Sequence, residues 1–274
     1  MSSATPPRLA ANANEETVSI DYSKIIAPVV IQDSSPIDLF YEHCRRLIVR
    51  SDGVDEWLLG LLVLDLISGT ETYIRRVLSG AINVCARCRT SAAGQQLTFG
   101  AASYYRDEEI ALALLESALS GEGGVKKKIA ALTGFEVKAG TSVASALAAF
   151  DRVCQLRHAI VHSHGELNYR NLTELELRLD LDAARQRIQL SAVSFQPLVV
   201  LCRNTVRALN NMLYVRIIDR WIDQGDLIGD WAKDRARVEP LVALLVSAED
   251  MPGQTAEAQY ASAIKLHIDA RNQV

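Results

Sequence analysis

Apolar side chains recur every three or four positions along most of the chain, which is the spacing of an amphipathic α-helix. The first such stretch, IDLFYEHCRRLIVR, follows Pro36, a residue that fits the first turn of a helix. A longer pattern extends from Val54 to about Arg89, and helical spacing returns in residues 141–162 and 195–224. The pattern therefore predicts a mainly α fold.

One stretch has a different period. In LTELELRLDLD, leucines alternate with charged residues at Leu175, Leu177, Leu179 and Leu181. Alternation with a period of two is typical of a half-buried β-strand. AARQR is then expected to turn the chain, and RIQLSAV alternates again. We therefore expect a β-hairpin at about residues 172–193, inserted among the helices.

These patterns divide the chain into three segments. Residues 1–35 are polar and rich in proline, serine and asparagine, so they are expected to form a flexible N-terminal arm. Residues 36–224 carry the long helical patterns and the hairpin, and they are expected to form the main helical domain. Residues 225–274 are expected to add a C-terminal helical extension.

The charge balance limits the functions to consider. The chain has 29 lysines and arginines against 33 aspartates and glutamates, a net charge of −4. This total does not indicate nucleic-acid binding, so such a role requires a local basic patch. Between Arg75 and Thr90 there are four arginines and no carboxylate, and Arg203 and Arg207 lie one turn apart later. Such rows can guide an RNA backbone, or they can form an ordinary solvated face.

Cysteine usage and the terminal sequence indicate a compartment. Five cysteines are an odd number, and the CxxC of Cys85 and Cys88 has no second pair at zinc-finger spacing, so packing residues are expected there. Free thiols indicate a reducing environment. The N-terminus lacks an export signal, and the apolar run Trp57–Leu64 is far shorter than the roughly 20 residues of a membrane span. We expect a soluble, cytoplasmic protein without membrane association.

Histidines are concentrated in one window. Three of the five lie in LRHAIVHSHGELNYRN, where Arg157 and His162 form the segment R-H-A-I-V-H at the end of an apolar helix. Gly165 is a credible helix stop just beyond. Five helical steps rotate the chain by roughly 500°, a net offset of about 140°. A long arginine and a shorter histidine can therefore flank one groove.

This arrangement resembles the signature of the HEPN superfamily, R-[polar]-x3-H at the end of an apolar helix, followed by small or polar residues and a glycine. HEPN domains are all-helical, and many are ribonucleases of toxin and anti-phage systems. The resemblance covers about residues 37–224 and implies a HEPN-like up-and-down helical bundle. HEPN relatives often carry an acidic or polar residue on an earlier helix that supports the motif arginine. Here Glu71 or Asp65 is the match.

The resemblance implies a metal-independent endoribonuclease that needs no cofactor. The nucleophile is the 2′-hydroxyl of the substrate, His162 moves protons as imidazoles do near neutral pH, and Arg157 stabilises charge on phosphorus. In HEPN ribonucleases two motif copies meet across a dimer interface, which implies a homodimer with a composite site. His158 is expected to orient Arg157 or touch phosphate.

The same reading gives substrate contacts and partners. Arg75, Arg76 and His164 are the expected substrate-binding residues, and the expected substrate is RNA, for example tRNA. A regulatory, antitoxin or defence partner protein is also expected. A subset of these toxins carries a tyrosine two residues after the motif histidine, which a partner nucleotidyltransferase modifies. That position is His164 here, so an antitoxin of that type is not expected.

Two other readings remain open. His158 and His162 are four residues apart, with His164 nearby as a third ligand, which is a spacing that metal sites use. No glutamate lies between the pair to act as a general base, and only Glu166 is close, so we favour a site without metal. The other reading is a non-catalytic HEPN-like module that binds a nucleotide or a protein within a larger defence complex.

Overall fold

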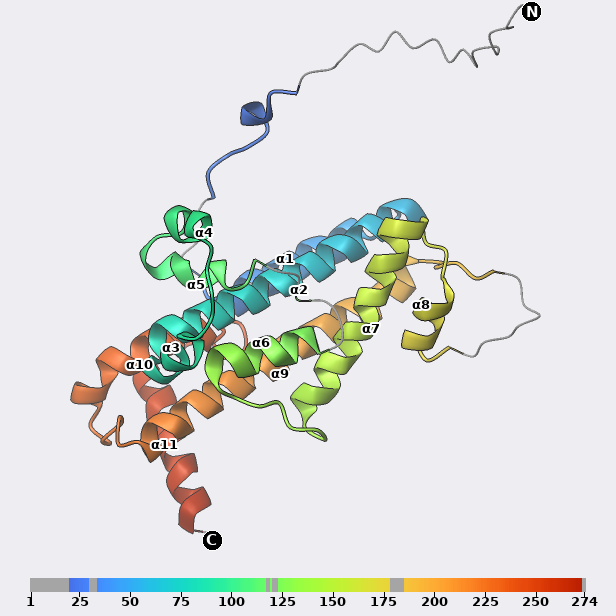
Figure 1. The fold of residues 1–274 in the computed structure, drawn as a ribbon. Coiled ribbons are helices and arrows are strands. Elements are labelled where there is room, and N and C mark those ends of the chain that lie inside the picture. Colours follow the sequence, from blue (N-terminus) through green and yellow to red (C-terminus); the bar gives the residue numbers. More distant parts are fainter. Residues whose placement is uncertain (1–19, 30–33, 117–118, 120–122, 178–184, 273–274) are drawn as a thin grey trace, which may run out of the picture. The chain divides into compact units, whose positions relative to one another are not determined.

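The structure is a computed structural model, and it describes residues 20–29, 34–116, 119, 123–177 and 185–272 (Figure 1). The chain divides into two units, residues 1–33 and residues 34–274. In the described part of the first unit there is one short 3₁₀-helix, η1, Tyr22–Lys24. Most of the predicted N-terminal arm lies outside the described residues.

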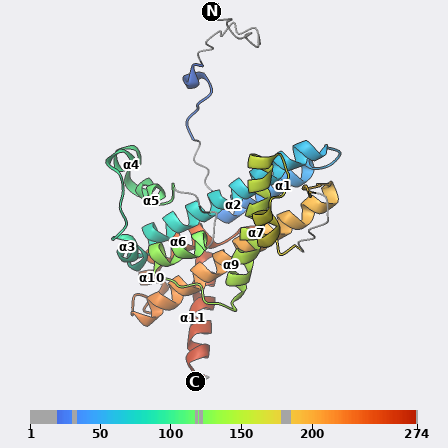
Figure 2. The same cartoon turned by 45° about the vertical axis from the view of Figure 1, so that its right-hand side comes forward.

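The described residues of the second unit are mainly helical, so the expected mainly α class is confirmed (Figures 1 and 2). In chain order the elements are α1 (Pro36–Arg50), α2 (Glu56–Val84), α3 (Ala86–Ala92), α4 (Phe99–Tyr104), η2 (Asp107–Glu109), α5 (Ile110–Ala113), α6 (Gly124–Thr133), α7 (Ser142–Ser163), α8 (Tyr169–Glu174), α9 (Ala192–Asp223), α10 (Trp231–Leu245) and α11 (Ala256–Asn272).

Helices α2 and α9 are the longest of these, and they pack against each other; α7 crosses both of them (Figures 1 and 2). Their contacts are made by fully buried side chains, among them Leu66 and Ile74 of α2, Phe150 of α7 and Leu213 of α9. Burying a side chain of this size stabilises a fold by about 1.5–3 kcal/mol relative to leaving it exposed. This core fixes the position of α7, the helix that carries the R-x4-H segment.

Helix α2 runs without a break through its three glycines, and at two of them, Gly69 and Gly80, an added Cβ would clash with a side chain of another helix. At Gly69 an added Cβ would lie 2.5 Å from Cδ2 of His43, so the missing side chain lets the imidazole of α1 reach α2. By length and composition alone, α2 is apolar enough to cross a membrane. That is weak support for a span, because the buried core helix of a soluble protein passes the same test.

The last two helices, expected as an extension, share the core of the second unit. Leu241 and Leu245 of α10 and Tyr260 of α11 are buried. Helix α10 packs against α2 and α9, and α11 packs against α10 and α9. Residues 225–272 therefore contribute to the same hydrophobic core as the motif helix.

The predicted β-hairpin at about residues 172–193 is not found among the described residues. The start of its first arm belongs to α8, because Asn168 and Asn171 form a reciprocal capping box that begins a helix there. Its second arm leads directly into α9 and makes one antiparallel bridge, Glu166 with Arg187. Residues 178–184, which hold the end of the predicted first arm and the start of the expected turn, lie outside the described residues.

Candidate functional site

The guanidinium of Arg157 contacts a buried carboxylate. Its Nη1 donates to Oε1 of Glu71 at 3.2 Å, and the other oxygen of Glu71 accepts from Nη2 of Arg75 at 3.3 Å. The Glu71 side chain is only 9% exposed, whereas that of Arg157 is 42% exposed. Hydrogen bonds with an ionised partner are shorter and stronger than neutral ones. One shielded carboxylate therefore holds two guanidiniums from two helices.

The other acidic residue expected to support Arg157 does not take that position. Asp65 faces α1, where its carboxylate lies 3.6 Å from Nε2 of His43 and its carbonyl oxygen 3.2 Å from the same nitrogen. Six helical steps separate Asp65 from Glu71, which is about 120° short of two full turns. The two carboxylates therefore lie on different faces of α2, and Glu71 is the one that faces α7.

The two histidines of the R-x4-H segment form an exposed pair. His158 and His162 are one turn apart, and their ring centroids are 4.8 Å apart with an interplanar angle of 54°. Both residues are exposed. Arg157 is turned by about 140° from His162 around the helix. Within one chain the guanidinium therefore extends toward α2, while the imidazoles face solvent.

Helix α7 ends directly after the motif, as the glycine stop led us to expect. Ser163 is its last residue, and His164 follows in the left-handed conformation with φ of 48°. The amide of Gly165 donates to the carbonyl oxygen of Ala159 at 3.0 Å, which satisfies one of the last carbonyls of the helix. His162 thus lies in the final turn of the helix, where its side chain is not enclosed by a following turn.

A pocket of about 570 Å³ adjoins this helix end. Its lining comes from the start of α2, the end of α7 and the segment that leads into α9. The lining includes Trp57, Leu61, Ile160, His164, Arg187 and Ile188. His164, expected to bind substrate, is therefore a wall of this pocket. Trp57 was missed from the sequence because it opens an apolar run and was counted with that run; in the structure it is 72% exposed.

The arginines expected to bind substrate have different surroundings. Arg75 is partly buried and, besides Glu71, donates through Nε to the carbonyl oxygen of Leu115 at 3.0 Å. These bonds hold α2 to the segment after α5, so Arg75 acts as a structural clamp in this arrangement. Arg76, one residue later, is exposed on α2.

The later arginine row is neutralised by carboxylates. Arg203 donates to Glu249 at 3.2 Å, and Arg207 donates to Asp250 at 3.1 Å. These pairs join α9 to the segment after α10. Of the basic rows considered from the sequence, this one therefore offers little free positive charge for an RNA backbone.

The cysteines are buried and make packing contacts. Cys85 and Cys88 are both fully buried at the junction of α2 and α3. A hydrogen bond from the Cys88 thiol, partly opposed by burial, lowers the pKa of Cys85 to about 5. Near the motif, burial and then the Glu71 carboxylate raise the pKa of Cys154. Cys154 is therefore held as an uncharged thiol and is not a candidate nucleophile.

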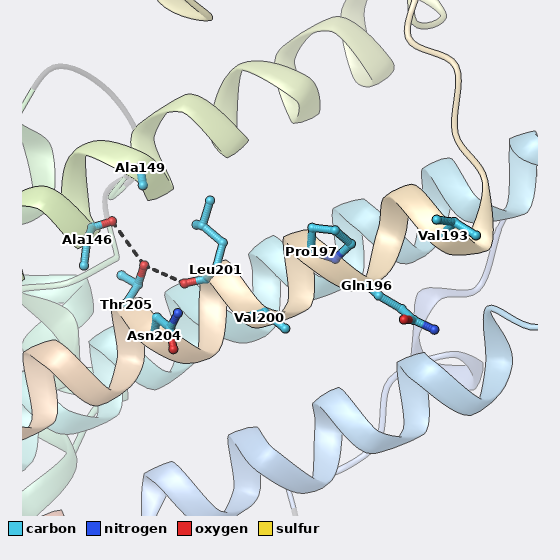
Figure 3. A pocket seen from close by; sticks show the side chains of 9 residues that line it. All are labelled: Ala146, Ala149, Val193, Gln196, Pro197, Val200, Leu201, Asn204 and Thr205. Carbon is cyan, nitrogen blue, oxygen red and sulfur yellow. Dashed lines mark hydrogen bonds between the residues drawn. The ribbon is translucent and has the colours of Figure 1, made fainter.

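A second hollow lies between α7 and α9, away from the motif (Figure 3). It has a volume of about 650 Å³ and is lined mainly by apolar groups, including Ala149, Val193, Pro197 and Val200. Nine helical steps from Ala149 to His158 turn the helix by about half a turn net. The groove therefore opens on the side of α7 opposite the two histidines.

Among the described residues, no group of three or more histidines, cysteines, aspartates or glutamates is arranged to hold a metal ion. No family model matches the chain, and no curated protein or solved structure matches it.

Proposed function

We propose that this protein is a metal-independent endoribonuclease of a toxin or anti-phage defence system, with a HEPN-like bundle. The observation that carries the proposal is the geometry around Arg157. Its guanidinium is oriented by a shielded carboxylate on α2, while His158 and His162 face solvent at the end of the same helix. A fixed cation and an exposed imidazole are the two groups that metal-free RNA cleavage requires.

The reaction proceeds by transesterification. An imidazole of His162 removes the proton from a ribose 2′-hydroxyl, and the 2′-oxygen forms a bond to the adjacent phosphorus. The bond from phosphorus to the 5′-oxygen breaks, and that oxygen takes a proton from an imidazolium. The products are a 2′,3′-cyclic phosphate and a 5′-hydroxyl. Arg157 donates to the non-bridging oxygens, where negative charge develops.

A homodimer supplies what one chain lacks. Base and acid are needed on opposite sides of the phosphorus, and in one chain Arg157 and His162 diverge by about 140° around α7. A twofold axis beside the end of α7 brings two copies of each group to one cleft. One His162 then acts as the base and the other as the acid, with the two guanidiniums on the phosphate between them.

Cleavage without metal tests this proposal. Purified protein is incubated with tRNA and bulk RNA in excess EDTA, together with the variants Arg157→Ala and His162→Ala. Removing a general base or a charge-stabilising donor is expected to lower the initial rate by roughly 10²–10⁴-fold. Arg152→Ala is the matched control, since this arginine lies on the same helix and makes an exposed ion pair with Glu176. Cleavage that is the same in all four proteins contradicts the proposal.

A second candidate function is a non-catalytic HEPN-like module that binds a nucleotide or a protein in a larger defence complex. The apolar groove between α7 and α9 favours it, because RNA cleavage does not use this surface (Figure 3). The two candidates differ in one phenotype. Growth arrest or phage protection is measured for the wild-type protein and for the double variant Arg157→Ala, His162→Ala; an equal effect of both proteins favours the binding module.

A further inference from the structure

The pocket beside the end of α7 takes no part in the chemistry described above. Its volume of about 570 Å³ falls in the range of small-molecule sites, roughly 300–1,000 Å³. The apolar part of its lining includes Leu61, Leu64, Ile160 and Ile188. The polar and aromatic lining residues are all exposed to solvent and form the rim of the pocket: Asp55, Glu56, Trp57, His164 and Arg187. Such a site accepts the flat apolar face of an aromatic ligand and forms hydrogen bonds with the ligand's polar edge.

Trp57 provides an aromatic surface at the pocket. It is 72% exposed, whereas Trp221, at the end of α9, is 2% exposed and packed in the core. A tryptophan left open to solvent beside an apolar hollow offers its ring for stacking. Bases of single-stranded RNA stack on such side chains and are hydrogen-bonded along their edges.

The polar groups on the rim determine which edge of a nucleobase can bind there. The carboxylate of Asp55 caps α2 by accepting from the amide of Leu58 at 2.8 Å. Glu56 is engaged only loosely, at 3.9 Å from Nη2 of Arg187. An ionised carboxylate accepts two parallel N–H donors. Guanine presents two adjacent donors on one edge, its ring N1–H and its exocyclic amino group.

Backbone hydrogen bonds hold Arg187 in place beside the motif. The amide of Ile188 donates to the carbonyl oxygen of Gly165 at 2.8 Å, and the amide of Leu167 donates to Gln186 at 2.9 Å. These bonds join the segment before α9 to the segment that follows α7, three and five residues after His162. The rim of the pocket is therefore tied to the helix end that carries the cleavage motif.

We infer that this pocket binds a guanine base of the RNA. The base stacks on Trp57, its two donors face the Glu56 carboxylate, and Arg187 contacts the neighbouring phosphate. The inference rests on the proposed ribonuclease function and gives it a base preference, namely cleavage next to guanine. His164 lines the pocket and lies two residues after His162, the proposed general base. The bound guanine nucleotide is therefore adjacent to the scissile bond.

Binding is tested with RNA that cannot be cleaved. Fluorescence anisotropy follows labelled 2′-O-methyl octamers, one all-uridine and one with a single guanine. The wild-type protein is expected to bind the guanine octamer about tenfold more tightly, and Trp57→Ala to weaken binding by about tenfold or more. Glu56→Gln removes the guanine preference but keeps binding to all-uridine RNA. Trp57→Phe retains most of the affinity, because it retains a stacking face.

The control is Phe99→Ala, which removes an aromatic side chain that is 89% exposed on α4, outside the pocket. Equal affinities for both octamers, or Trp57→Ala and Glu56→Gln variants that bind like the wild type, overturn the inference. Since 2′-O-methyl RNA reports binding alone, the two proposals fail separately. If cleavage depends on Arg157 and His162 but shows no preference for guanine, only the proposed guanine pocket is contradicted. If the protein binds guanine through Trp57 but does not cleave RNA, only the proposed ribonuclease function is contradicted.

Discussion

At the scale of single residues, the account depends on how Glu71 holds Arg157. A guanidinium on a long side chain has several rotatable bonds, and catalysis requires it in one orientation. The Glu71 carboxylate removes that freedom, because it is shielded from water and is itself held by Arg75. In the proposed reaction, the cation on the phosphate is therefore positioned by a residue that does not contact substrate.

Replacing Glu71 with glutamine tests this positioning. Glu71→Gln keeps the shape but removes the charge that both guanidiniums share, so the free energy of unfolding should fall by about 2 kcal/mol. The cleavage rate should fall by about 10–100-fold, with the shape of the pH profile preserved because His162 remains. Urea denaturation and initial rates measure the two effects. The control Glu42→Gln breaks an exposed ion pair with Arg46 on α1. Wild-type rates in Glu71→Gln would show that Arg157 is positioned by other contacts.

At the scale of elements, the end of α7 is the decisive feature. The helix stops at Ser163 because His164 adopts a left-handed conformation, which exposes the last turn and His162 with it. A residue with a Cβ is strained there by about 1–2 kcal/mol. The strained residue, His164, follows the R-x4-H segment directly and also lines the pocket.

A pair of glycine substitutions checks this helix end. His164→Gly relieves the left-handed strain and is expected to raise the free energy of unfolding by up to about 1 kcal/mol. His158→Gly, in the helix interior, is expected to lower it by about 1 kcal/mol. Thermal and urea denaturation compare the two variants. An equal loss in both would mean that α7 continues past Ser163.

Much of the element pattern could be predicted from the sequence, and the failures have physical causes. The three-and-four spacing and Pro36 predicted α1, and Gly165 predicted the end of α7. The alternating leucines predicted a strand from residue 172, but the capping box of Asn168 and Asn171 begins a helix that extends through Glu174, and residues 178–184 lie outside the described residues. The period of apolar residues does not reveal such a reciprocal pair, because both of its partners are polar.

The candidate site was predictable only in part. The R-x4-H segment and its supporting acidic residue could be proposed from sequence, but the choice between Glu71 and Asp65 depends on which face of α2 meets α7. The pocket with Trp57 and Arg187 joins segments about 130 residues apart. No spacing rule along the chain brings them together.

At the scale of the whole second unit, the segment after α10 connects that helix to α1 and α9. Asp38 in the first turn of α1 accepts from the hydroxyl of Ser247 at 2.6 Å and from the amide of Ala248 at 3.0 Å. Tyr41 donates to Asp250, which also accepts from Arg207 of α9. These bonds fasten the C-terminal part of the unit to its first helix, so residues 225–272 support the fold that holds the motif.

Neutralising Asp38 tests that connection through its pH dependence. Burial raises the pKa of Asp38, but hydrogen bonds from Ser247, Ala248 and Ser35 outweigh it and lower the pKa overall. A lowered folded-state pKa stabilises the fold above the ordinary value near 3.8, and this contribution is lost as the pH falls through the folded value. Asp38→Asn should therefore lower the free energy of unfolding by about 1–2 kcal/mol at pH 7.

The difference in unfolding free energy between the wild type and Asp38→Asn should shrink as the pH falls below about 4. There the wild-type carboxyl also becomes protonated. Denaturant titrations at several pH values measure it. The control is Asp52→Asn, an exposed residue in the loop between α1 and α2. A gap that stays constant down to pH 2 would mean that the side chain acts through its shape rather than its charge.

The chemical ends of the RNA products test the central claim most directly. RNA cleaved by the wild-type protein in excess EDTA is analysed by mass spectrometry, beside the Arg157→Ala and His162→Ala proteins. Attack by the neighbouring 2′-hydroxyl predicts 2′,3′-cyclic phosphate and 5′-hydroxyl ends, which are lost in both variants. Products with 3′-hydroxyl and 5′-phosphate ends, or cyclic ends that persist in both variants, would contradict the assignment of the chemistry to Arg157 and His162.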